Sequence, residues 1–152
     1  MFLLGATASL LTACGKKIGD ECETSLDCNP EGAWTCDRSQ PGGYCTVDGC
    51  DHRSCPDDAV CIRFFPGRFL TMVCDPPAED TPGGTDDCGP DELCLPEGRC
   101  APRASERRFC AASCGENGDC RGGYVCRESG SEGTVALLPT PGATARFCAP
   151  RQ

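Results

Sequence analysis

The chain has 152 residues, of which 17 are cysteine, and its formal net charge is −9. Cysteine at this density in a short chain is typical of secreted disulfide scaffolds, and an aromatic content of 6% is too low for a hydrophobic core of ordinary size. The acidic charge excludes nucleic-acid binding through phosphate neutralisation and general electrostatic attachment to anionic lipid.

The N-terminal stretch, residues 1–13, is apolar and uncharged, and "CGKK" follows it from Cys14. A membrane-spanning helix needs about 20 apolar residues, so this run has the length of a signal-peptide core instead. The letters "LTAC", residues 11–14, resemble the bacterial lipobox, which implies that the cysteine sulfur receives a diacylglycerol and that the chain is cut before it. An ordinary secretory signal with an incidental cysteine and a buried strand are the alternatives. We therefore predict a signal peptide, lipid attachment at Cys14 and a tether over 14–21.

The other sixteen cysteines fall into two sets of eight, one from Cys22 to Cys74 and one from Cys88 to Cys148. Intervals between successive cysteines agree between the sets within two residues, except for the last interval. With Cys14 lipidated, an even number remains and all can pair. We predict a duplication, and the alternative is one irregular knot of sixteen cysteines. The expected segments are repeat 1 over 22–74, a proline-rich acidic linker over 75–87, repeat 2 over 88–148 and a tail over 149–152.

Regular secondary structure should be sparse, because no window has the apolar spacing of a capped amphipathic helix. The best strand candidates, residues 62–65 and 69–73, flank Pro-Gly-Arg and predict a hairpin between Cys61 and Cys74. Its counterpart in the second repeat spans 134–148. The expected fold class is small and disulfide-rich, with two tandem eight-cysteine modules, little regular secondary structure and a short β-hairpin in each.

Spacing does not decide which cysteines pair, because eight cysteines allow many connectivities. We expect local interlocked pairs, in which the first cysteine of each half-repeat bonds the third and the second bonds the fourth. The expected bonds are Cys22–Cys36, Cys28–Cys45, Cys50–Cys61, Cys55–Cys74, Cys88–Cys100, Cys94–Cys110, Cys114–Cys126 and Cys120–Cys148.

The motifs of metal and catalytic sites are mostly missing. Cys-x2-Cys, the spacing that zinc and iron–sulfur sites favour, occurs nowhere, so we expect no metal at the cysteines and no cofactor. A catalytic triad would need His52, the only histidine, as its base, and small disulfide repeats rarely enclose a pocket of ~300 Å³. We therefore expect no enzyme. We expect acidic turns such as "GENGD", residues 115–119, to be solvated surface turns, and calcium binding by their carboxylates is the alternative.

An apolar cluster beside arginines is the main candidate for a partner surface. We expect Phe64, Phe65, Arg68 and Phe69 to contact a protein partner, because exposed aromatic side chains next to arginine are frequent at interfaces. The alternative is that this segment covers the disulfides and forms a miniature core.

The lipobox, "GDECETSLDC" at 19–28 and "GENGDCRGGYVC" at 115–126 together resemble the cysteine-rich lipoproteins of myxobacteria and their relatives. The half-repeats are also loosely similar to EGF-type and Dickkopf-type modules. The resemblance implies a lipoprotein, and by the enterobacterial sorting rule Gly15 implies the outer membrane, facing the periplasm or the cell surface. We expect a lipid-anchored, non-enzymatic envelope structural or protein-binding module with an unknown protein partner. A calcium-dependent adhesion module and a secreted-type protease inhibitor, with residues 64–68 as its loop, are the alternatives.

Overall fold

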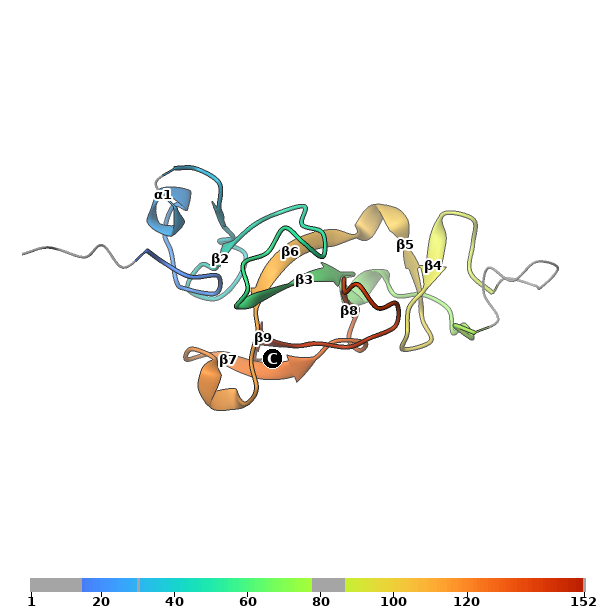
Figure 1. Ribbon diagram of the computed structural model, residues 1–152. Coiled ribbons are helices and arrows are strands. Elements are labelled where there is room, and N and C mark those ends of the chain that lie inside the picture. Colours follow the sequence, from blue (N-terminus) through green and yellow to red (C-terminus); the bar gives the residue numbers. More distant parts are fainter. Residues whose placement is uncertain (1–14, 30, 78–86, 152) are drawn as a thin grey trace, which may run out of the picture.

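A computed structural model describes residues 15–29, 31–77 and 87–151 of the chain (Figure 1). The expected signal peptide, Cys14 and most of the expected linker lie outside these residues. The sixteen cysteines from Cys22 to Cys148 all lie inside them and form eight disulfides. The described residues otherwise hold short antiparallel strands and one four-residue α-helix. The fold is therefore small and disulfide-rich, as the composition predicts.

The disulfides divide the cysteines into four units of four. In every unit the first cysteine bonds the third and the second bonds the fourth, so the two bonds interlock. The units are unit 1 (Cys22, Cys28, Cys36, Cys45), unit 2 (Cys50, Cys55, Cys61, Cys110), unit 3 (Cys74, Cys88, Cys94, Cys100) and unit 4 (Cys114, Cys120, Cys126, Cys148).

The third and fourth cysteines of each unit lie opposite one another on two antiparallel strands. Residues that face one another across such a ribbon project to the same side. Both disulfides of a unit therefore leave the ribbon on one side, toward the first and second cysteines. The facing pairs are Cys36 and Cys45 on β1 (Thr35–Cys36) and β2 (Cys45–Thr46), Cys61 and Cys110 on β3 (Ala59–Phe64) and β6 (Arg107–Ala112), Cys94 and Cys100 on β4 (Glu92–Cys94) and β5 (Cys100–Pro102), and Cys126 and Cys148 on β7 (Tyr124–Glu128) and β9 (Arg146–Pro150).

A short polar residue immediately before the second cysteine closes the loop of each unit. Its side-chain oxygen accepts a hydrogen bond from the backbone N–H of the residue that follows the first cysteine, at 2.8–3.4 Å. In units 1, 2 and 4 this bond spans three or four residues, so a local contact holds the first two cysteines close together. In unit 1 it encloses α1 (Ser25–Cys28), and in unit 4 it encloses the 3₁₀ helix η3 (Asn117–Asp119). The four acceptors are Asp27, Ser54, Asp87 and Asp119.

Unit 3 is inserted between the third and fourth cysteines of unit 2, and this corrects two of the expected bonds. Cys55 bonds Cys110 and Cys74 bonds Cys94, in place of Cys55–Cys74 and Cys94–Cys110. The other six bonds join the partners that the interlocking rule predicts. The expected modules, 22–74 and 88–148, consequently do not close on themselves, because two disulfides cross from one to the other.

Strand pairing explains the exchange of partners. β3 and β6 pair over six residues with Cys61 opposite Cys110, which places the neighbouring Cys55 within reach of Cys110. The chain around Cys74 pairs instead with the β4–β5 hairpin, where the Cys74 N–H donates to the Gly98 carbonyl at 3.0 Å. Each cysteine therefore bonds on the ribbon where backbone pairing has already placed it.

The two expected hairpins do not form. β3 is the central strand of a three-stranded sheet, between β6 and β8 (Thr134–Ala136), and its residue Ile62 is 0% exposed. The stretch after β3 turns into the 3₁₀ helix η1 (Gly67–Phe69) instead of returning as a strand. Likewise, β8 pairs with β3 while β9 pairs with β7. A strand buried on its faces needs partners at both edges, and a hairpin supplies only one.

Aromatic, polar and apolar contacts join the units to one another. Units 1 and 4 meet where the Tyr44 and Tyr124 rings lie 5.5 Å apart and the Arg121 guanidinium lies 4.4 Å from the Tyr124 ring centre. Burial raises the pKa of Tyr44 to about 12, and its hydroxyl accepts the Ala112 N–H at 2.9 Å. At the other end, Phe65 packs with Leu95 and Ala101 of unit 3. In Figure 1 the α1 end, where the described chain begins, and the β4–β5 hairpin of unit 3 lie at opposite ends of the molecule.

Candidate functional site

The residues predicted to contact a partner do not form one surface. Phe65 is 0% exposed and belongs to the core, which corrects the expectation for this residue. Phe69 is 37% exposed, and the Arg68 guanidinium lies 4.5 Å from its ring centre. Phe64 is half-buried and lines a cleft whose lining includes neither Arg68 nor Phe69. The miniature-core interpretation therefore holds for Phe65, and Phe64 leads to a different candidate site.

The cleft lies between the three-stranded sheet and the β7–β9 ribbon, and its volume is about 260 Å³. Alternation along the strands places Phe64 of β3 and Phe109 of β6 on the sheet face that packs against Phe147 of β9. These three rings line the apolar floor. Two arginine–carboxylate pairs line its walls, one joining unit 1 to β6 and one within unit 4.

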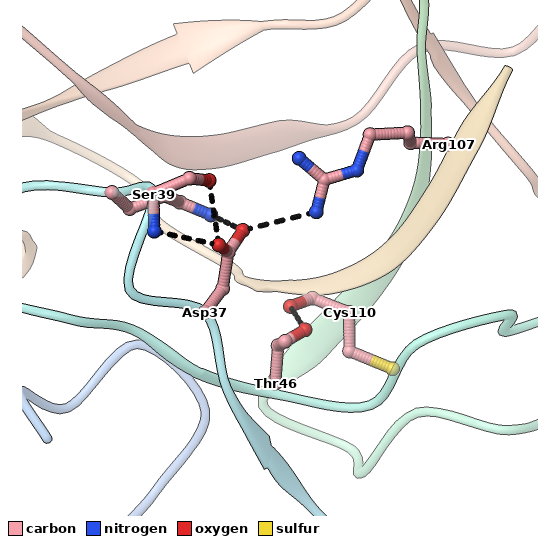
Figure 2. A network of polar contacts seen from close by, with 6 residues as sticks. Asp37, Ser39, Thr46, Arg107 and Cys110 are labelled. Carbon is pink, nitrogen blue, oxygen red and sulfur yellow. Dashed lines mark hydrogen bonds and ion pairs between the residues drawn. The ribbon is translucent and has the colours of Figure 1, made fainter. Parts of the chain in front are cut away.

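The first wall is a network centred on Asp37, whose side chain is 9% exposed (Figure 2). Its Oδ1 accepts the Ser39 N–H at 3.0 Å and the Ser39 hydroxyl at 2.6 Å. Its Oδ2 accepts the Gln40 amide at 3.4 Å and the Arg107 Nη2–H at 3.3 Å. Beside the network, the Thr46 hydroxyl donates to the Cys110 carbonyl at 2.7 Å and ties β2 to β6. Unit 1 therefore holds the Arg107 side chain in place.

The charge of Asp37 is stabilised despite its burial. Burial acts to raise the pKa of this carboxyl, but the hydrogen bonds from Ser39 and Gln40 and the charge of Arg107 outweigh it, and the pKa lies below its usual range. Asp37 is therefore ionised at neutral pH. With four donors on two oxygens, it fixes the orientation of Arg107.

The second wall holds the described chain's one non-glycine residue with a positive φ, Glu132 at +52°. This conformation costs about 1–2 kcal/mol, and such strain concentrates at functional sites. The Glu97 carboxylate, from the β4–β5 loop of unit 3, holds it by accepting the N–H groups of Glu132 at 2.6 Å and Gly133 at 2.7 Å. The Glu132 side chain then pairs with Arg127 of β7. All four units thus contribute to the cleft or to its support.

Sulfur clusters in the structure result from the interlocked bonds. In every unit three sulfur atoms lie within 4.8 Å of one another. A bonded sulfur is not a thiolate, so it cannot act as a metal ligand in this state. Among the described residues, no group of three carboxylate or histidine ligands comes as close. Asp119, in the acidic turn that left calcium open, accepts the N–H groups of Gly115 at 2.8 Å and Glu116 at 3.0 Å, and these bonds lower its pKa.

Sequence reasoning missed the charged residues of the cleft. A signal in the sequence bears on the exchanged disulfides instead: "RFCA" occurs twice, at 108–111 and at 146–149. Matching these two copies identifies Cys110 and Cys148 as equivalent fourth cysteines, which places β6 and β9 in equivalent positions. The expected lipidation at Cys14 falls outside the described residues, and His52 is exposed in a turn.

Within the part of the chain that the structure describes, no helix has both the length and the apolar character needed to cross a bilayer. No protein-family model matches this chain, and comparison with curated proteins and with solved structures finds no similar protein.

Proposed function

We propose that this chain is a lipid-anchored, non-enzymatic module of a bacterial envelope that binds a protein partner in an oxidising space. The observation that carries the proposal is the cysteine pairing. Every cysteine from Cys22 to Cys148 has a disulfide partner, which leaves Cys14 as the odd one of 17. Disulfides at this density are typical of exported proteins, and the remaining cysteine is the one that the lipobox resemblance marks for lipid.

The arrangement of the molecule supports a tethered binding module. A tether through Cys14 would hold the α1 end nearest the lipid, since the described chain begins there, and would direct unit 3 away from it (Figure 1). Cross-linking in every unit keeps the cleft walls rigid, which lowers the conformational entropy lost when a partner binds. On this view the outer membrane is the location, with the cleft facing the periplasm or the cell surface.

The protease-inhibitor alternative has little support from the segment 64–68. An inhibitory loop has to present extended, exposed backbone, but Phe65 is buried and the chain turns into a 3₁₀ helix from Gly67.

The test is production of the full chain in a Gram-negative host, followed by mass spectrometry of the N-terminal peptide and thiol alkylation of the native protein. We expect Cys14 to carry a diacylglyceryl thioether and an acylated amine, and no other cysteine to react. Cys14→Ser should abolish membrane association and leave the disulfides intact. An unmodified, alkylated Cys14 in exported protein would remove the anchor from the proposal, and reactive thiols at the other positions would remove the oxidising location.

A further inference from the structure

We propose that the cleft binds the C-terminal residue of a partner polypeptide, with an apolar side chain on the aromatic floor and the terminal carboxylate on Arg107. This inference rests on the proposed function and specifies the chemistry of the partner. Three features of the cleft lead to it: its size, the open donors of Arg107 and the balance of charge along its walls.

The size of the cleft suits a single residue. Its volume of about 260 Å³ lies just below the ~300–1,000 Å³ typical of pockets for whole small-molecule ligands. The floor is apolar, with ring surface from the half-buried Phe64 and Phe109, and the buried Phe147 and Ala149 and the half-buried Pro150 line it further. An apolar side chain placed there would leave water and contact aromatic carbon on several sides.

Arg107 is the group that would recognise the carboxylate. Its side chain is 48% exposed, and Asp37 bonds only its Nη2. Among the described residues its other nitrogens have no hydrogen-bond partner. A guanidinium carries five N–H donors in a planar fork that matches the two oxygens of a carboxylate. Because Asp37 is already occupied by Ser39 and Gln40, it orients this fork and leaves the outward donors to a ligand.

The charge of the walls favours an anion at Arg107 over an anion elsewhere on the molecule. The protein carries a net charge of −9, but along the cleft the carboxylates of Asp37 and Glu132 are each paired with an arginine. A bound carboxylate therefore meets a locally neutral wall with exposed guanidinium donors. Ser39 and Arg107 at the rim are exposed, so a polypeptide whose last residue occupies the floor can continue outward into solvent.

The experiment is a calorimetric titration of the full chain, in detergent micelles, with the peptide acetyl-Gly-Gly-Phe and with the same peptide amidated at its C-terminus. We expect saturable binding of the free acid and binding at least about tenfold weaker for the amide, since a charge-assisted hydrogen bond is lost. Arg107→Gln should weaken binding of the acid by a similar factor. Arg108→Gln is the matched control, because Arg108 is the next residue on β6, is similarly exposed at 44%, and projects to the opposite face.

Either of two calorimetric results overturns the inference: no binding of the free acid to the wild type, or equal affinity for the acid and the amide. If Arg107→Gln does not fold, amide chemical-shift changes in the wild type decide the matter. The acid peptide should perturb Arg107, Phe109 and Phe147, and shifts confined to other residues would contradict the site. The lipid measurement on Cys14 is independent, so an absent anchor with retained peptide binding removes the anchor alone.

Discussion

Removing the Cys55–Cys110 disulfide should lower the free energy of unfolding by about 4 kcal/mol. The perturbation is the double variant Cys55→Ala with Cys110→Ala. This bond closes the longest loop of the eight, with a sequence separation of 55, and the chain-entropy relation converts that length into the stated value. The value is an upper one, because Cys74–Cys94 remains and shortens the loop in the unfolded chain.

A matched comparison comes from the short loop of the same unit. Cys50–Cys61 has a separation of 11, and its removal should cost about 3 kcal/mol by the same relation. Guanidinium unfolding followed by circular dichroism measures both values under non-reducing conditions, where small disulfide-bonded proteins unfold in two states. A larger loss for the Cys50–Cys61 variant would contradict the loop-length argument.

Thiol counting provides the refuting result for the connectivity. In the structure, the Cys55→Ala/Cys110→Ala variant leaves every remaining cysteine bonded, so alkylation should find no new thiol. The variant Cys55→Ala/Cys74→Ala should instead deprive both Cys94 and Cys110 of their partners. If the first variant exposes thiols and the second exposes none, Cys55 bonds Cys74 and the insertion of unit 3 into unit 2 is wrong.

Three further predictions concern stability. Phe65→Ala should cost about 3–5 kcal/mol because the ring is fully buried, whereas Phe69→Ala should cost less than about 1 kcal/mol, and denaturant midpoints that coincide would contradict this. Gly49→Ala should lower the free energy of unfolding by only about 1–2 kcal/mol, because its φ of +68° is its one unfavourable feature. Gly43→Ala, at a φ of +69°, should cost clearly more, because the new Cβ would also overlap the Cys22 carbonyl. Equal thermal midpoints for the two variants would contradict this overlap. The pKa of Asp37 is lower in the folded chain than its ordinary value of 3.8, so its contribution to stability is present above pH 3.8 and disappears as pH falls through the folded pKa. Asp37→Asn should therefore flatten the acid limb of stability against pH, and an unchanged limb would show that the carboxylate contributes nothing.

The sequence did not decide the pairing, but the expected interlocked pattern proved correct for six of the eight bonds. Short-range features set the rule: an acceptor side chain such as Asp27 or Asp119 closes the loop between the first two cysteines, and a tight spacing places the third nearby. These features act within a few residues, so they can be read from the chain. The apolar character of the segment after Cys61 can also be read from the chain. Periodicity did not show, however, that Phe65 would be buried and Phe69 exposed.

The cleft could not be read from the sequence, because its walls come from distant parts of the chain. Arg107 and Asp37 are 70 residues apart, and Glu97 supports Glu132 from 35 residues away. Each of these residues is an ordinary surface charge in its local context. Only the packing of the β7–β9 ribbon against the sheet brings the two walls to one cleft.

Composition was enough to predict a cross-linked, core-poor fold, whereas the interlocked bonds inside each group of four cysteines were an expectation that the structure confirms for six of eight bonds. Tertiary structure alone decided that the fourth cysteine of unit 2 is Cys110 and not Cys74. The physical reason is that loop-closure entropy changes slowly with length, so the two closures differ by only about 1 kcal/mol and spacing hardly distinguishes them. Six residues of paired backbone between β3 and β6 do distinguish them, because they place Cys110 opposite Cys61 and beside Cys55.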